Sequence, residues 1–158
     1  MKTITYLKGD ATAPKTEGNK MIVHICNDLG GWGKGFVLAI SNKWSEPEKA
    51  YREWHKNKQN NDFELGAVQV VKVSEDLFVV NMIAQQGLKR VNNIAPIRYE
   101  AVKSCLSKII IEANKLNTSV HMPRIGCGLA GGKWEEIELI IHETLSKNNV
   151  EVYVYDFE

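Results

Sequence analysis

Residues 122–138, MPRIGCGLAGGKWEEIE, place four glycines between a short apolar stretch and a charged amphipathic pattern. Three of them, Gly126, Gly128 and Gly131, spell G-x-G-x-x-G, which binds dinucleotides where it opens a βαβ unit and an acidic residue follows about 20 positions later. Because this loop lies only 27 residues from the end of the sequence, we expect just one helix and one strand to follow it. The loop is thus suited to holding a phosphate, whereas the dinucleotide-binding fold is excluded.

Strand-like and helix-like patterns alternate through most of the sequence. Strands are predicted in TITYLK, MIVHIC, AVQVVKV, LFVVNMI, SVHMP and VEVYVYDF, at 3–8, 21–26, 67–73, 77–83, 119–123 and 150–157. Helices are predicted over 36–44, from residue 46 onward, over 98–116 and over 133–148. The last two have apolar stripes at helical spacing, formed by Val102, Leu106, Ile109, Ala113 and Leu116 and by Ile137, Ile140, Ile141 and Leu145. We therefore predict a three-layer α/β/α sandwich with a mixed, largely parallel central sheet.

The composition indicates one domain, residues 1–158, because 158 residues with 44% apolar content suffice for one core and not for two. A net charge of +1 gives no reason to expect nucleic acid or membrane partners. Three widely spaced cysteines without a leading apolar segment favour a reduced, cytoplasmic protein. The histidines and cysteines have no metal-ligand spacing, so we expect no metal site. We also expect no cofactor, and a monomer.

A second glycine-rich segment, NDLGGWGKG at 27–35, also lies between a predicted strand and a predicted helix. Glycines let successive backbone N–H groups surround an anion, and a helix N-terminus adds partial positive charge. Two such loops suit a diphosphate, although either could simply be a tight turn. A P-loop is excluded, because Gly35 stands where Ser or Thr would hold magnesium and Asp28 replaces the first glycine.

The sequence resembles a macro domain over essentially its full length, and most of all the branch that contains the terminal ADP-ribose protein glycohydrolase. The resemblance is carried by LKGDAT, HICNDLGGWGKGFVLAIS, NMI, MPRIGCGLAGGKWEEIE and VYVYDF. It implies an α/β/α module that binds ADP-ribose or mono-ADP-ribosylated proteins.

The resemblance also implies roles for individual residues. Asp10 would accept a hydrogen bond from the adenine amino group, with the Ala11 backbone against the base, while Asn27 would face the distal ribose. Tyr155, Asp156 or Phe157 would flank the adenine. The diphosphate and distal ribose would lie between two loops, formed by Gly33, Lys34, Gly35 and Phe36 on one side and by Gly126, Cys127, Gly128, Leu129, Ala130 and Gly131 on the other.

Three departures from the family pattern concern catalysis. Gln85 stands where the glycohydrolase branch has a nucleophilic lysine, and Ala130 stands where it has an aspartate directly after GCGL. Val37 stands where the other hydrolase branch has an aspartate in its first glycine loop. Because glutamine forms no lysine adduct and alanine is no base, neither established catalytic set is present.

Three functions remain open. The first is hydrolysis of ADP-ribosyl groups from proteins, with an ester to Asp or Glu favoured and with Asn27, Asp28 or Gln85 ordering a water. The second is a non-catalytic reader of ADP-ribose, and the third is a phosphatase acting on ADP-ribose 1″-phosphate. For Asp28, binding of backbone N–H groups within its turn is favoured over ordering a water, and Trp32 could be a lid or a packed residue. A thiolate would be favoured at Cys127 if its loop is electropositive.

Overall fold

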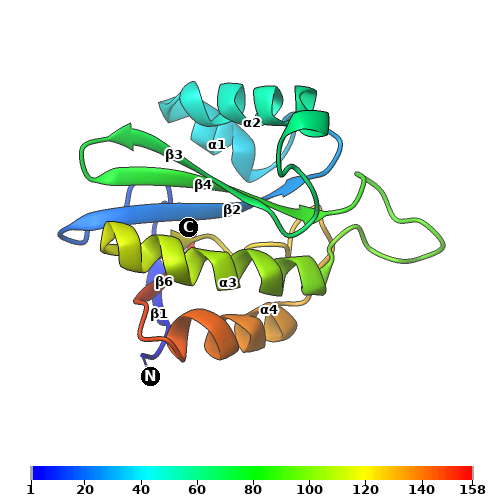
Figure 1. The fold of residues 1–158 in the computed structure, drawn as a ribbon. Helices are drawn as coiled ribbons and strands as arrows, with labels where there is room; N and C mark the ends of the chain where they lie inside the picture. Colours follow the sequence, from blue (N-terminus) through cyan, green and yellow to red (C-terminus); the bar gives the residue numbers. More distant parts are fainter. Residues whose placement is uncertain (1, 158) are drawn as a thin grey trace.

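A six-stranded mixed sheet forms the centre of the computed structural model, which describes residues 2–157 (Figure 1). The strands lie in the order β1-β6-β5-β2-β4-β3. All neighbours are parallel except β3 and β4, which form an antiparallel hairpin. Their bounds are β1 Thr5–Lys8, β2 Asn19–Asn27, β3 Val68–Ser74, β4 Leu77–Gln85, β5 Thr118–Met122 and β6 Val152–Asp156.

Helices cover both faces of this sheet and confirm the predicted three-layer arrangement (Figure 1). Helices α1 (Phe36–Lys43) and α2 (Glu46–Lys56), followed by the 3₁₀ turn η1 (Lys58–Asn60), lie on one face. Helices α3 (Tyr99–Leu116) and α4 (Trp134–Ile141) lie on the other. The predicted helix over 133–148 changes at residue 142 into a π-helical turn, η2 (His142–Ser146).

Each face of the sheet has its own apolar core. The core beneath α3 and α4 contains the buried members of the predicted helical stripes, Val102, Leu106, Ile109, Ala113, Ile137, Ile141 and Leu145. The core beneath α1 and α2 is rich in aromatic side chains, among them Trp32, Tyr51, Trp54 and Phe63. Alternate residues of β2 enter opposite cores: Met21 and Val23 enter the first, and Ile22 and Cys26 the second. An almost unbroken apolar strand fits this doubly covered position.

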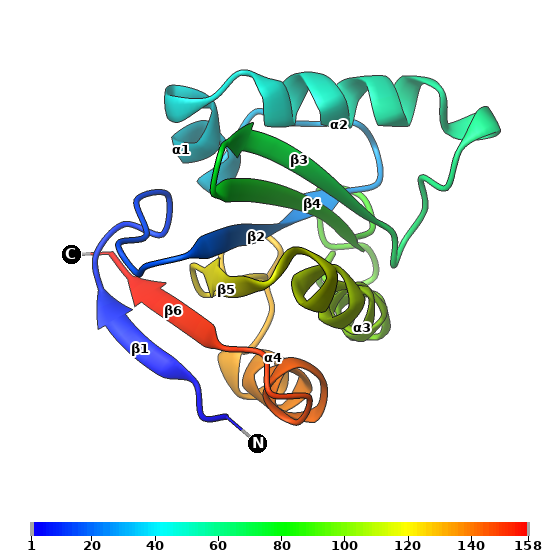
Figure 2. The same cartoon turned by 60° about the vertical axis from the view of Figure 1, so that its left-hand side comes forward.

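The five parallel strands end at one edge of the sheet, so the loops that follow them lie along that edge. Figure 2 shows the order of the strands, with β1 and β6 on one side of β2 and with β4 and β3 on the other. The central pair matters most, because β5 and β2 are hydrogen-bonded neighbours. Residues 123–133 follow β5 and residues 28–35 follow β2. The two glycine loops therefore leave adjacent strands in the same direction, at the edge where parallel sheets bind ligands.

Candidate functional site

The two glycine loops meet at this edge. A β-carbon built on Gly35 in the first loop would lie 3.4 Å from Cδ1 of Leu129 in the second. Leu129 is nevertheless 63% exposed, so its side chain bridges the loops at the surface rather than in the core. The expected approach of two glycine turns from separate parts of the sequence is thus present in the fold.

The second glycine loop has free backbone donors. Within residues 2–157, the N–H groups of Gly126, Gly128, Leu129 and Ala130 have no acceptor from the protein. Those of Cys127, Gly131 and Gly132 donate to carbonyl oxygens inside the loop and close its turns. A run of unpaired N–H groups, held by internal bonds, is the arrangement that binds phosphate oxygens.

Two glycines of this loop have different physical roles. Gly126 has a φ of 75°, and a β-carbon there would lie 2.6 Å from Cδ1 of Ile97. Only glycine therefore fits this position without displacing its neighbours. Gly128 has open space within 4 Å of a β-carbon, so its absent side chain leaves room above the loop.

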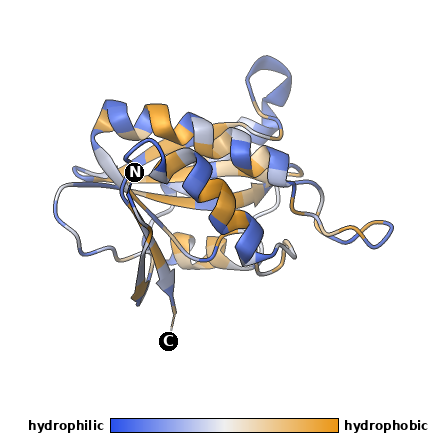
Figure 3. Ribbon diagram, turned by 90° about the horizontal axis from the view of Figure 1, so that it is seen from below, coloured by the Kyte–Doolittle hydropathy of each residue, from blue (hydrophilic) through white to orange (hydrophobic). Residues whose placement is uncertain are grey.

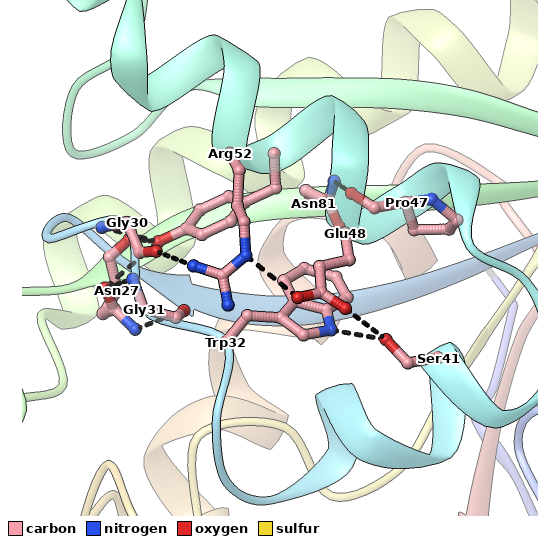
Figure 4. A network of polar contacts seen from close by, with 10 residues as sticks. Asn27, Gly30, Gly31, Trp32, Ser41, Pro47, Glu48, Arg52 and Asn81 are labelled. Carbon is pink, nitrogen blue, oxygen red and sulfur yellow. Dashed lines mark hydrogen bonds and ion pairs between the residues drawn. The ribbon is translucent and has the colours of Figure 1, made fainter.

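The side chain of Asn27 shapes the first glycine loop (Figure 4). Its Oδ1 accepts the N–H groups of Leu29 and Gly31 at 2.9 and 3.0 Å, while Nδ2 donates to the carbonyl oxygen of Gly31 at 2.9 Å. The hydroxyl of Tyr51 also donates to Asn27. Asn27 is 8% exposed, and one of its two Nδ2–H groups remains free for a ligand. Its amide is therefore mostly used within the loop and is not the open group expected beside a ribose.

The rest of this loop rests on α1 and α2. The indole of Trp32 is 3% exposed and donates to the hydroxyl of Ser41 at 2.7 Å, which decides for packing and against a lid (Figure 4). In the part of the chain that the structure describes, the N–H groups of Gly33, Lys34, Gly35 and Phe36 have no protein acceptor. Gly33 and Lys34 are exposed, so this half of the loop can accept a ligand.

Asp10 lies at the end of β1 and is oriented by Thr12. One carboxylate oxygen accepts both the backbone N–H and the hydroxyl of Thr12, at 2.8 and 2.6 Å. The Thr12 hydroxyl bond holds the pKa of the Asp10 carboxyl below its usual value, so the group is ionised at neutral pH. Its other oxygen has no protein donor within residues 2–157, and Ala11 beside it is buried.

The three residues expected beside an adenine differ in the structure. Tyr155 is 7% exposed, and its hydroxyl lies 2.7 Å from Nδ1 of His121, so its ring belongs to the interior. Asp156 is held in a two-bond ion pair by Arg124, at 2.6 and 3.0 Å. Phe157 is 81% exposed and is therefore the ring of this group that can stack on a base. The N–H of Gly9 donates to the carbonyl oxygen of Asp156, which joins this segment to the Asp10 turn.

Asp28 and Gln85 lie together at the ends of β2 and β4. The N–H of Asp28 donates to the Gln85 carbonyl oxygen at 3.0 Å, and its carboxylate accepts the N–H of Gly87 at 2.8 Å. The Gln85 amide donates to the Gly87 carbonyl oxygen, which leaves its Oε1 without a protein donor among residues 2–157. Asp28 therefore accepts a backbone N–H group, as in the favoured alternative, but this group belongs to another loop and not to its own turn, which corrects that expectation.

Residues 86–98 form a feature that sequence reasoning missed. Bridges join Gln85 to Ile97 and Val91 to Ile94, so the chain folds out and back as a hairpin. Asn92 and Asn93 turn it with φ angles of 52° and 63°. Two asparagines between β-branched residues are a recognisable signal for such a turn, and VNNI could have been identified. Figures 1 and 3 show this hairpin extending beyond the rest of the molecule.

The shifted pKa values of Cys127, His24 and His121 do not favour a nucleophile in the second glycine loop or in the strands beside it. Burial raises the pKa of the Cys127 thiol despite the nearby Arg124, which corrects the expectation of a favoured thiolate. Burial also lowers the pKa of His24 and of His121 to about 4, since both side chains lie in the interior. Within residues 2–157, no cluster of three or more potential ligands could hold a metal ion.

Charge is concentrated around the glycine loops. Residues 28–35, 86–98 and 123–133 carry six cationic side chains and one acidic one. The remaining sequence carries fourteen cationic and eighteen acidic side chains. These three segments therefore carry a net charge of +5, of which the charge of Arg124 is paired with Asp156 at the same edge.

A polar cavity lies at the opposite end of the sheet. It has a volume of about 440 Å³ and is lined by residues that include Asn19, Asn114, Ser119 and Tyr153. These residues flank the amino ends of β2, β5 and β6, away from the glycine loops. None of the helices within residues 2–157 has the length and apolar character needed to cross a bilayer.

The protein has a mixed, largely parallel sheet between two helix layers, and its two central strands lead into glycine-rich loops that face each other. This arrangement defines a nucleotide-binding α/β module. The chain belongs to the macro domain family, whose sequence profile matches residues 23–141. A solved macrodomain protein from Streptomyces coelicolor is 52% identical, with a TM-score of 0.88 and coverage of 98% of this chain and 99% of that one.

Two further relatives have named activities or architectures. The chain is 28% identical to ADP-ribose glycohydrolase OARD1 of Bos taurus, with 96% of this chain and 90% of that protein covered. It is 32% identical to chromodomain-helicase-DNA-binding protein 1-like of Mus musculus, with 98% of this chain covered. The chain spans only 18% of the length of that larger relative.

Proposed function

We propose that this protein binds ADP-ribose across its two glycine loops and hydrolyses ADP-ribosyl groups from modified proteins, with an ester linkage to Asp or Glu favoured. The observation that carries this proposal is the pair of loops with unpaired N–H groups at the ends of neighbouring strands. Membership of the macro domain family and similarity to a protein named ADP-ribose glycohydrolase support it.

The order of the strands gives the ligand a direction. Asp10 and Phe157 follow the outer strands β1 and β6, and they are the groups that fit the adenine end. The glycine loops follow the central strands β5 and β2 and fit the diphosphate, with donors from Gly33 to Gly35 on one side and from Gly126 to Ala130 on the other. Gln85 is the last residue of β4, which puts the distal ribose and its reactive anomeric carbon beside it.

In the proposed hydrolysis, Gln85 orders the attacking water and Asp28 supports it. The free Oε1 of Gln85 is an acceptor for a water proton, and the N–H of Asp28 donates to the backbone carbonyl oxygen of Gln85 at 3.0 Å, which fixes the Gln85 backbone. An ester at an anomeric carbon is a reactive bond, so positioning a water can replace a strong base. Ala130 supplies no side-chain base, because its methyl group cannot accept a proton.

The deciding experiment is a hydrolysis panel with ester-linked, N-glycosidic and 1″-phosphate forms of ADP-ribose. We expect release of ADP-ribose from a Glu-modified protein, and a Gln85→Ala variant should lose at least about tenfold in kcat while binding ADP-ribose normally. Gln59→Ala, an exposed glutamine on η1, is the matched control. Release at the buffer rate from every form would exclude hydrolysis, and phosphate release alone would identify a phosphatase.

A reader without activity is the second candidate, favoured by Gln85 and Ala130 in place of the family's lysine and aspartate. It predicts ADP-ribose binding by calorimetry together with no product from any member of the panel. The two candidates use the same binding residues and differ only in whether the bond between ADP-ribose and the modified residue is cleaved.

A further inference from the structure

The hairpin over residues 87–96 projects from the ligand edge but has a fixed base. At its start, the N–H of Gly87 donates to Asp28 at 2.8 Å and the N–H of Gln86 donates to the Pro96 carbonyl oxygen at 2.9 Å. At its end, the guanidinium of Arg98 donates to Gln86 and to the Ala95 carbonyl oxygen. These bonds hold both arms at the edge of the sheet, so the base of the hairpin has a fixed position relative to the sheet.

The same base is joined to the second glycine loop. The N–H of Ile97 donates to the Ala130 carbonyl oxygen at 3.1 Å. A β-carbon on Gly131 would lie 2.9 Å from that of Ala95, so the hairpin arm and the loop are in close contact. Asp28 provides the matching link to the first glycine loop. The hairpin is thus anchored to both loops that are proposed to hold the diphosphate.

The outer part of the hairpin exposes apolar and cationic side chains. Leu88, Val91 and Ile94 are 55%, 64% and 60% exposed. Lys89 and Arg90 lie between the first two, and residues 86–98 contain no acidic side chain. Figure 3 shows the mixture of hydrophobic and hydrophilic residues along the projecting segment. Exposed apolar side chains that lie next to charges of a single sign are typical of a binding surface.

The strand order places this surface at one end of the proposed ligand. The adenine end lies toward β1 and β6, whereas β4, from which the hairpin emerges, lies on the side of the distal ribose. The modified residue is attached at that ribose. The macromolecule that carries the ADP-ribosyl group must therefore leave the cleft close to the hairpin.

We propose that residues 87–96 dock the modified protein itself, through an acidic polypeptide segment that contains apolar side chains and adjoins the ADP-ribosylated residue. This inference rests on the proposed function. Lys89 and Arg90 complement the acidic groups, and Leu88, Val91 and Ile94 receive the apolar ones. A nucleic acid fits less well, because the hairpin contains no aromatic ring on which a base could stack.

The test compares binding of the whole modified protein with binding of its small ligand. The variant Lys89→Glu/Ile94→Ser reverses a charge and removes an exposed apolar side chain without touching the proposed ligand-binding residues. Lys115→Glu/Ile111→Ser makes the same chemical changes on the exposed side of α3, where Ile111 is 65% exposed. The ligands are free ADP-ribose, an acidic protein ester-modified with ADP-ribose at Glu, and an oligonucleotide carrying terminal ADP-ribose.

We expect the hairpin variant to bind free ADP-ribose as the wild type does and to lose about tenfold in affinity for the modified protein. The α3 variant should keep both affinities. An unchanged affinity for the modified protein, an equal loss in the α3 variant, or a loss confined to the oligonucleotide would each overturn the docking proposal. Failure of the wild type to bind free ADP-ribose would instead contradict the proposed function, so the two failures are distinct.

Discussion

The carboxylate of Asp28 accepts the backbone N–H of Gly87 at 2.8 Å, and this bond ties the first glycine loop to the projecting hairpin. Asp28 and Gly87 are 59 residues apart in the sequence. Their contact makes one structural unit of two loops that follow neighbouring strands, β2 and β4.

Removal of this carboxylate should loosen the hairpin. In Asp28→Ala the Gly87 N–H loses its partner, at a cost of about 1 kcal/mol, so the hairpin should open more often. Trypsin cleaves after Lys89 or Arg90, and we expect that cleavage to be several times faster in the variant, as followed by mass spectrometry. The control is Asp76→Ala, at the β3–β4 turn, where the carboxylate pairs with Lys20 instead. Equal cleavage rates in the three proteins would show that the bond does not position the hairpin.

The two glycines of the second loop should separate folding from binding. Gly128→Glu meets open space, so the protein should fold while the added negative charge prevents diphosphate binding and abolishes ADP-ribose affinity in calorimetry. Gly126→Ala should instead lower the free energy of unfolding by about 1–3 kcal/mol, because it combines positive φ with a 2.6 Å contact to Ile97. Ser107→Glu on α3 controls for the charge. A folded Gly128→Glu protein with normal affinity would mean that the loop has been misassigned.

Asp10 should discriminate ligands by their base. Asp10→Ala removes the acceptor proposed for the adenine amino group and should weaken ADP-ribose binding by about 1–3 kcal/mol. Ribose 5-phosphate, which lacks the base, should bind wild type and variant alike. Asp10→Asn keeps an oxygen for Thr12 and separates the turn's stability from the contact with the base. An equal loss for both ligands would contradict the adenine assignment.

Acid should destabilise the fold through its buried histidines. Burial lowers the pKa of both His24 and His121 to about 4, below the usual value of 6.5. The neutral forms therefore contribute stability that is present above pH 6.5 and is lost as pH falls from 6.5 toward 4. Urea titrations at pH 7 and pH 5 should record a lower unfolding free energy at pH 5. The drop should shrink in His121→Gln, whereas His142→Gln, at the surface side of η2, serves as the control; identical drops in all three proteins would refute this origin.

The periodic parts of the sequence predicted the fold well. In the predicted stripe of α3, Val102, Leu106, Ile109 and Ala113 are buried and Leu116 is partly buried, and the nearly unbroken apolar run in β2 lies between two cores. These predictions succeed because burial imposes a regular spacing on side chains along a helix or strand. The end of the helix after Ile141 was not predicted, because the wider π turn over His142–Ser146 leaves the apolar pattern intact.

The site was predicted less completely than the fold. The glycine patterns correctly indicated which two loops approach each other, since their strand and helix context fixes their position in a parallel sheet. The sequence did not reveal that Asn27 and Trp32 are used within their own loop, nor that Tyr155 faces His121. Such choices depend on partners in other elements, such as Tyr51 of α2, 24 residues from Asn27, and Ser41 of α1, nine residues from Trp32, and no local pattern encodes them.

The two cores have a consequence for the two glycine loops. Trp32 fixes the first loop to the aromatic core under α1 and α2, whereas Ile125 and Ala130 fix the second to the core under α3 and α4. A ligand that binds to both loops connects the two outer helix layers of the molecule. Its binding should therefore make those layers melt in concert, and a scanning calorimeter would record a sharper transition as well as a higher Tm.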